Sequence, residues 1–520
     1  MDNLLQFSQE SYWGQIWPEI ALVLGAMAIL LFDLFRPGNS EKKSNITGSF
    51  AVFFQCALLV YHLFDYLLIN HTFDRSSFEG MLSHGFQGDL KRTFFLMSSV
   101  CVSVLGNRYL GGKNLGHGEF HHLTMIATAG LMLLCQSSNF IILFVALETV
   151  ALAFYPLVAY DRNSAKSLEA GIKYLVFGAL SSALLLLGIV LIYGVGANPV
   201  AWGAIPIEQS HLDVLSFEYV RLLLEVNADN ILLRSGVLLV ISGLAFKVGA
   251  APFQIWVPDV YHGSPIPITA FLAVSSKAAG FFLLLNLVNG PFEYMNEFLL
   301  PLMGFVATFT ILFGNLAACA QKKLKRVLGL SGVAHAGYLL VAVMASMHFP
   351  GDSDPAVWVV YSYLFVYQFA SFIVFGVMNM ASLKDDTEHE FENYEGLLKK
   401  CPWLAICLVA GIASLAGIPP FAGFIAKLTL FSVAFKAKLY VSLVAMVIGV
   451  VISIYYYFGW IRAICFEPRP RHDDEESIDN PWTHLSQLGL AKWLIVILTL
   501  VSLVLGVWQG PFGDVFVWSW

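Results

Sequence analysis

Charged residues are scarce in this sequence. Only 12% of its 520 residues are Asp, Glu, Lys or Arg, and 58% are hydrophobic, whereas a soluble domain carries about 25% charged residues. The composition excludes a soluble protein and a nucleic-acid-binding protein. It predicts an all-α, polytopic membrane protein, because a helix satisfies its own backbone hydrogen bonds inside a bilayer. The net charge of -7 is spread over the loops and indicates no particular partner.

Motifs that bind cofactors are also missing. The seven cysteines show no C-x-x-C or Cys/His spacing, and most lie in apolar segments, where a thiol behaves as a small hydrophobic group. There is no dinucleotide-binding glycine loop, P-loop or haem-ligand pattern. We therefore expect no disulfide, metal or cofactor in this chain, and any redox chemistry should belong to another chain. The N-terminus lacks the basic region and cleavage site of a signal peptide.

Apolar stretches of about 20 residues, the length that crosses a bilayer, predict about fourteen transmembrane helices. No linker is long enough to divide the chain, so residues 1–520 should form a single integral membrane domain. The predicted spans begin near Trp17, Thr47, Arg92, Phe120, Phe140, Leu168, Ser235, Pro265, Glu297, Val327, Val357, Trp403, Leu439 and Lys492.

Lysines and arginines concentrate in the connections that follow odd-numbered spans, for example at Arg162, Lys166 and the run 322–326. Since positively charged loops stay in the cytoplasm, these connections should face the cytoplasm. With an even number of spans, both termini then lie on the non-cytoplasmic side of the inner membrane. Lys91 and Arg92 are among the few exceptions.

Two apolar segments contain helix breakers. One holds Gly249 and Pro252 beside Lys247, and the other holds Gly417 and Pro420 ahead of Lys427. Proline removes a backbone donor and clashes with the preceding turn, so helices seven and twelve should be broken within the membrane. Paired broken helices indicate inverted repeats. We expect two inverted five-helix repeats at about 120–288 and about 295–466, with flanking helices at about 17–110 and 491–508.

Four isolated charges lie inside otherwise apolar spans: Glu148, Lys247, Lys277 and Lys427. Each costs roughly 2.5–3.5 kcal/mol to insert, so we predict that they move an ion or a proton. Structural alternatives remain open. Glu148 could be neutral and hydrogen-bonded, Lys247 could extend to the interface, and the other two lysines could only hold helices together.

Weaker candidates surround these four. His335 could connect the two lysine regions, or it could be an ordinary buried histidine. Lys173 follows Glu169 by four residues, so it could form only a local pair at the interface. Glu19 and His121 lie near predicted span ends, and we expect both at the membrane interface.

The segments that carry these charges resemble the antiporter-like membrane subunits of the proton-pumping NADH:quinone oxidoreductase, respiratory complex I. The pattern K-x-x-x-x-P-F-x-x-W-x-P-D-x-Y-x-x-[SA]-P at 247–265 is highly specific for this superfamily. The match runs from Trp17 to about Phe466, and it is poor between the first span and Phe120. The acidic stretch RHDDEES at 471–477 departs from it. Other matching segments are LETVALAFYPLVAY, GNLAACAQKKLKRVLGLSGVAHAGYLL and GIASLAGIPPFAGFIAKLTLF.

The resemblance implies a role for each charge. Glu148 and Lys247 match the family's coupled pair, Lys277 its connecting lysine, Lys427 its exit-side lysine and His335 a histidine on the same polar axis. Electron transfer from NADH to quinone would drive protons along this axis. Other membrane and peripheral-arm subunits would be the partners and would bind FMN, iron–sulfur clusters, NADH and quinone, and the complex would lie in the bacterial cytoplasmic membrane.

Two other functions stay open. The chain could be a subunit of a cation/proton antiporter or a membrane hydrogenase of the same superfamily, which copurifying chains would reveal. Alternatively, it could be a structural spacer. Neutralising the buried charges would then reduce assembly and leave pumping per assembled complex intact.

Overall fold

The computed structural model describes residues 12–508, apart from 36–39, 69–74, 112, 114, 199–212, 350–354, 382–385 and 467–488. Both termini, and with them the predicted side of the membrane on which they lie, are outside the described residues. The acidic stretch at 471–477 is outside them as well.

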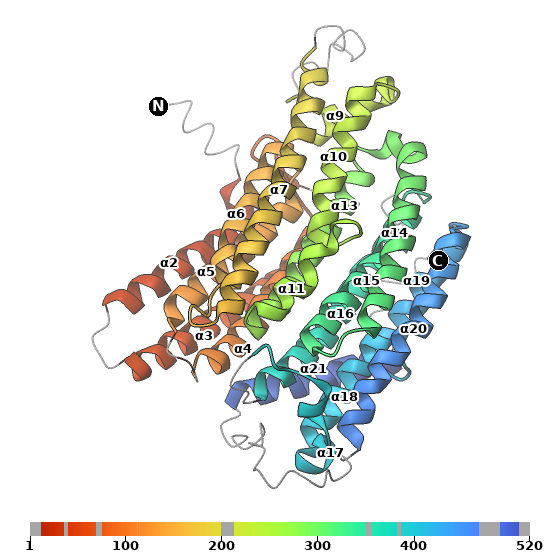
Figure 1. Cartoon of the computed structure of the whole chain (residues 1–520). Coiled ribbons are helices and arrows are strands. Elements are labelled where there is room, and N and C mark those ends of the chain that lie inside the picture. Colours follow the sequence, from red (N-terminus) through yellow and green to blue (C-terminus); the bar gives the residue numbers. More distant parts are fainter. Residues whose placement is uncertain are drawn as a thin grey trace.

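Helices make up most of the described chain, and the long ones run alongside one another in one elongated bundle (Figure 1). In the first half they are α2 (Trp17–Phe35), α3 (Ser40–Leu68), α4 (Phe86–Leu110), α5 (His117–Gln136), α6 (Phe140–Val158), α7 (Ala165–Gly196), α9 (Phe217–Asn227), α10 (Ile231–Val248) and α11 (Trp256–Gly263). In the second half they are α12 (Ile266–Phe271), α13 (Lys277–Val288), α14 (Asn296–Cys319), α15 (Leu324–Ser346), α16 (Pro355–Met380), α17 (Leu397–Lys400), α18 (Pro402–Ala416), α19 (Ala422–Lys436), α20 (Tyr440–Cys465) and α21 (Gly489–Val507).

Short elements join these helices. Strands β1 (Arg75–Ser77) and β2 (Leu82–His84) form an antiparallel hairpin with Ser76 opposite Ser83. Single turns stand at η1 (Trp13–Ile16), η3 (Phe253–Ile255), η5 (Glu293–Met295) and η6 (Phe391–Tyr394), and the π-helical turn η4 (Leu272–Ser276) joins α12 to α13. The last helix, α21, packs against α4, α16 and α19 and so contacts both halves of the chain.

The bundle has two ends, which we name by the helices that begin there. At the α4 end, α4 and α16 begin and α5 and α13 finish, and residues of all four line one cavity. At the α7 end, α7 and α12 begin and α4 and α6 finish. The loop charges of the sequence predict that the α7 end is cytoplasmic.

The surface of the bundle is apolar, and many polar groups lie inside it. Ile172, Val441, Tyr455 and Val507 are among the large hydrophobic side chains that are at least 66% exposed. This distribution suits a lipid environment, because large exposed apolar surfaces are rare on soluble monomers. The protein is an integral membrane protein of the all-α class, as the composition predicted.

Eleven helical segments of the described chain are long and apolar enough to cross a membrane. The three other predicted spans, which correspond to α4, α5 and the pair α18–α19, are not among them. Most residues of α4 and α5 are buried against other helices, so these helices can carry more polar side chains than a lipid-facing helix. The total of about fourteen spans stays a prediction, as do the bounds of the two repeats.

Two helical segments are interrupted next to the buried lysines. Helix α10 finishes at Val248, Gly249 adopts the left-handed conformation with φ of 74°, and α11 begins at Trp256. Helix α18 finishes at Ala416, Gly417 adopts φ of 80°, and α19 begins at Ala422. Glycine suits both positions because it has no Cβ atom to clash at positive φ.

Candidate functional site: a buried row of ionisable side chains

Capped helices place the first two charges. The Asn139 side chain accepts a hydrogen bond from Ile141 N and starts α6, which carries Glu148 in its middle. The Asn230 side chain accepts from Leu232 N and starts α10, which carries Lys247 in its last turn. Such caps satisfy amide donors that a helix start leaves free.

Glu148 and Lys247 interact through space and not by direct contact. Glu148 is the charged group that acts electrostatically on Lys247, yet among the described residues no ion pair or hydrogen bond joins them. Glu148 Oε1 is buried and has no hydrogen-bond partner in the described chain, and Lys247 is only 8% exposed. Glu148 Oε1 is therefore free to accept a hydrogen bond from a bridging group.

Lys277 lies at the centre of the bundle, directly after the π-helical turn η4. Its Nζ atom donates a hydrogen bond of 2.7 Å to the backbone oxygen of Gly332 on α15. The same atom lies 5.3 Å from the centre of the Tyr367 ring on α16. π-helical turns frequently mark functional sites in helices, and here the turn immediately precedes a buried amine.

His335 lies near both Lys277 and Lys427. Both lysines act on it electrostatically, and its Nδ1 atom makes a 2.7 Å hydrogen bond with the Tyr363 hydroxyl. The Tyr367 ring, which faces Lys277, is 5.1 Å from the His335 ring. The imidazole is thus the central group of a polar cluster that extends from one lysine to the other.

Lys427 belongs to α19, and its side chain contacts the interrupted end of α18. Its Nζ atom donates a 2.7 Å hydrogen bond to the oxygen of Ala416, the last residue of that helix. Helix ends leave such carbonyls without an intrahelical partner and concentrate partial negative charge there. A cavity of about 10 Å3 lined by His335, Tyr363 and Lys427 lies beside it, which is at the lower limit for one water molecule.

Lys173 is not part of this row. At the α7 end, its Nζ atom pairs with Glu169 at 2.7 Å, the predicted local contact, and with Asp259 at 2.6 Å. Asp259 also pairs with Arg326 at 2.8 Å, and the Lys173 side chain is 35% exposed. These carboxylate contacts near the surface distinguish Lys173 from the buried Lys247, Lys277 and Lys427.

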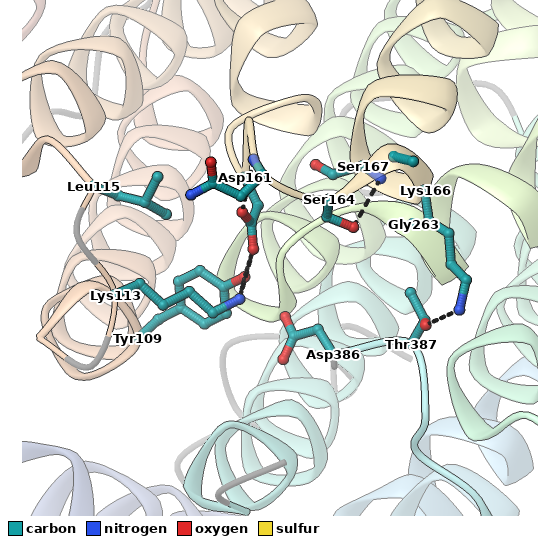
Figure 2. Close-up of a pocket in the computed structure, with 12 residues that line it drawn as sticks. Tyr109, Lys113, Leu115, Asp161, Ser164, Lys166, Ser167, Gly263, Asp386 and Thr387 are labelled. Carbon is teal, nitrogen blue, oxygen red and sulfur yellow. Dashed lines mark hydrogen bonds and ion pairs between the residues drawn. The ribbon is translucent and has the colours of Figure 1, made fainter. Parts of the chain in front are cut away.

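A pocket of about 540 Å3 opens at the α7 end, between α4, α7 and the connection from α11 to α12. Figure 2 shows Lys113 turned toward Asp161 on one wall and Lys166 turned toward Thr387 on the other. Asp386 lies between them and accepts a hydrogen bond from Ile266 N at the start of α12. Helix α12 leads from this pocket through η4 to Lys277, so the pocket lies at one end of the element that carries the central lysine.

Two residues that the sequence predicts at the membrane interface are buried against other helices. Glu19 is 2% exposed and pairs with Arg92 at 2.8 Å. His121 is fully buried, and its Nε2 atom lies 2.9 Å from Asn107 Oδ1. Packing of α2 and α4 against α5 covers these side chains, and a single helix sequence does not reveal such packing.

Two further lysines are buried that the sequence pattern does not single out. Lys91 is 5% exposed and Lys325 is 1% exposed. Lys325 Nζ donates a hydrogen bond of 2.5 Å to Ser264 O. Both residues stand near the start of a helix, where a lysine usually reaches the membrane surface. Their burial follows from neighbours that are distant in the sequence.

Amines, an imidazole and phenols can each hold and pass a proton. The backbone carbonyls at Lys277 and Lys427 accept a hydrogen bond from an ammonium or from a neutral amine alike, so neither protonation state breaks the contact. Among the described residues, no three His, Cys, Asp or Glu side chains form a group that could hold a metal ion. The chemistry that these side chains offer is proton transfer.

Comparison with known proteins defines the class first. Residues 137–453 match the model of the family described as NADH:quinone oxidoreductase/Mrp antiporter, TM. This range contains all six candidate residues. The fold is also similar to that of a chain in the Mrp complex from Dietzia sp. DQ12-45-1b, with a TM-score of 0.75, 18% identity and 95% of each chain covered.

The similarity extends to a particular branch of that family. The chain is 45% identical over 507 residues to NADH-quinone oxidoreductase subunit N 1 of Opitutus terrae, with 96% of each chain covered. It is also similar to a chain of respiratory complex I from Thermus thermophilus, with a TM-score of 0.72, 26% identity, and 95% of this chain and 97% of that chain covered. The chain belongs to the family of the NADH-quinone oxidoreductase subunit N proteins, the antiporter-like membrane subunits that the sequence motifs indicated.

Proposed function

We propose that this chain is a proton-translocating membrane subunit of an NADH:quinone oxidoreductase in the bacterial cytoplasmic membrane. It serves the enzyme as one subunit among many. NADH, FMN, iron–sulfur clusters and quinone bind to other subunits, with which this chain assembles through its membrane helices. The identity of 45% to a subunit N protein over almost the whole length supports this assignment over an antiporter or hydrogenase subunit.

The main support for the proposal is that the buried lysines have backbone carbonyls, not carboxylates, as their hydrogen-bond partners. Lys277 and Lys427 are 5% and 7% exposed, and each donates to one backbone carbonyl. A permanent structural charge in such a place is normally matched by a carboxylate, because an unpaired buried charge is costly. Side chains that must exchange protons are better served by partners that tolerate both protonation states.

The proton path runs along these residues. Quinone reduction in another subunit shifts charge along the polar axis and changes the separation of Glu148 and Lys247. Lys247 then passes its proton toward Lys277, and the Lys277 ammonium passes one through Tyr367 and His335 toward Lys427. Water molecules fill the gaps that side chains do not bridge. Moving one charge against about 100 mV requires roughly 2.3 kcal/mol, which is less than an ion pair gains in a poorly polar interior.

The test is Lys247→Ala in the assembled complex. We expect proton translocation per assembled complex to fall by about tenfold or more, because removing a positioned proton donor typically costs about 100-fold in rate. The measurement is NADH-driven quenching of an acidity-sensitive dye in inside-out membrane vesicles, with the amount of assembled complex determined in parallel.

Lys323→Ala is the control, because Lys323 is a partly exposed lysine paired with Glu390 at 2.6 Å. It should leave translocation near the native value. Native translocation by the Lys247→Ala complex would refute the proposal. Reduced assembly with normal pumping per complex would indicate a structural spacer, and purification without any NADH-oxidising subunit would indicate an antiporter or hydrogenase.

A further inference from the structure

A second large cavity lies at the α4 end of the bundle, opposite the pocket of Figure 2. It measures about 520 Å3, and its walls include His84, Gln87, Lys91, Asn286, Asn289 and Tyr361. One water molecule in the liquid takes up about 30 Å3, so the cavity has space for on the order of ten. Polar and apolar side chains line the cavity in similar measure, and the polar ones can hold water molecules by hydrogen bonds.

Lys91 forms part of the wall of this cavity. Like Lys277 and Lys427, it is buried and donates hydrogen bonds to uncharged oxygen atoms. Its Nζ atom donates to Cys135 O at the end of α5, at 3.2 Å, and to Asn286 Oδ1 on α13, at 2.9 Å. No carboxylate pairs with it among the described residues. The neighbouring Arg92 forms ion pairs with Glu19 and Asp89. Lys91 therefore has two oxygen partners that tolerate either an ammonium or an amine.

Helix α13 connects Lys91 with the centre of the bundle. Lys277 begins this helix and Asn286, the partner of Lys91, lies nine residues later, which is about 14 Å along the axis. Phe282 stands between them, with its ring centre 5.9 Å from Lys91 Nζ. The rings of Phe94 and Tyr361 pack on Phe282 at 5.7 Å and 4.8 Å. This aromatic cluster separates the cavity from Lys277.

We propose that Lys91 is a further proton-exchanging residue, through which Lys277 exchanges protons with the aqueous phase at the α4 end. This inference rests on the proposed function. One proton leaves the Lys277 ammonium, passes the aromatic cluster when Phe282 moves aside, and binds to the Lys91 amine. The Lys91 ammonium then releases this proton to water in the cavity. Lys277 regains a proton from Lys247 along the proposed path, so that both Lys91 and Lys277 return to their starting protonation states.

The experiment compares Lys91→Arg with Lys91→Met in the assembled complex. Arginine keeps the positive charge and the hydrogen bonds but does not release its proton. If Lys91 acts by exchanging a proton, both variants should lower translocation per assembled complex by about tenfold, the order expected for loss of a proton-transfer group. Arg221→Gln is the matched control, because Arg221 is a half-exposed cation at the same end, paired with Glu293, and it should pump normally.

Native pumping by Lys91→Arg would overturn the inference and would mean that the residue supplies only a charge, for instance to an anionic lipid headgroup in the cavity. If the complex with Lys91→Met does not assemble, proton translocation by the Lys91→Arg complex alone tests the inference. A Gln87→Cys variant tests the cavity separately. A membrane-impermeant thiol reagent added from the outside should label it, and absence of labelling would also overturn the inference.

Lys247→Ala is measured alongside. If it abolishes pumping while both Lys91 variants pump normally, only this inference fails. If Lys247→Ala pumps normally, the proposed function fails first.

Discussion

At the scale of single residues, two groups of lysines differ clearly in the described part of the chain. Lys113, Lys173 and Lys323 pair with carboxylates at the α7 end, and each is partly exposed. Lys277 and Lys427 are buried and contact carbonyl oxygens and aromatic rings. Surface ion pairs contribute little to stability, so the first group could be changed with small effect. The buried group is where a change in charge state has large consequences.

A substitution at Gly332 changes the position of the Lys277 amine without removing the amine. A Cβ atom on Gly332 would lie 2.8 Å from Lys277 Nζ and 3.3 Å from the Tyr367 hydroxyl. In Gly332→Ala the amine must leave the carbonyl that it contacts. We expect normal assembly and a several-fold lower translocation per complex, since small misplacements of a transfer group can cost about 100-fold.

Gly459→Ala serves as its control, because a Cβ atom there would meet nothing within 4 Å. Both variants are measured by dye quenching per assembled complex. Equal, native-like pumping by both would show that the contact of Lys277 with Gly332 has no role in translocation.

Single residues also show the limit of sequence reasoning. The four central charges were identified because each is alone in an apolar segment, which a one-dimensional pattern reveals. Lys91, Glu19 and His121 are also buried but stand near helix ends, where charge is unremarkable. Only the neighbours that pack on them, such as Asn286 beside Lys91, distinguish them from interfacial residues.

At the scale of elements, close helix packing positions Lys247. A Cβ atom on Gly188 of α7 would lie 2.6 Å from Gly236 O on α10, and one on Gly243 of α10 would lie 2.8 Å from Leu185 Cβ on α7. Ser181 Oγ donates to Gly243 O at 2.8 Å in the same contact. Small residues that let two helix backbones approach are typical of membrane helix pairs.

Gly188→Ala should therefore push α7 and α10 apart. Overpacking of this kind costs about 1–3 kcal/mol, so we expect the purified complex to lose this subunit at a lower temperature. Gly194→Ala on the same helix is the control, because a Cβ atom there meets nothing within 4 Å. If the two variants lose the subunit at the same temperature, the glycine contact does not hold α10 in place.

The helix interruptions illustrate what local sequence can predict. Glycine and proline mark the places where α10 and α18 finish, and both interruptions use a left-handed glycine. Their common construction supports the proposal of two inverted repeats at about 120–288 and 295–466. The sequence does not reveal that the freed carbonyl of Ala416 receives Lys427, because that contact depends on how α19 folds back.

At the scale of the whole molecule, the bundle carries its polar groups inside and leaves an apolar surface for lipid. One large cavity lies at the α7 end and another at the α4 end. Lys277 lies on the helical path from α12 through η4 to α13 that leads from one to the other. Composition was enough to predict this general plan. The cavities and the order of contacts along the row arise from helices far apart in the sequence, so composition alone does not contain them.

The most direct measurement is proton translocation by the complex with Lys277→Met, reconstituted in liposomes and compared with the native complex. Methionine keeps most of the length of the side chain and removes the proton-carrying group. We predict that translocation per assembled complex falls by about tenfold or more, because the central transfer group is lost. Native proton translocation by this complex would contradict the claim that buried lysines carry the protons.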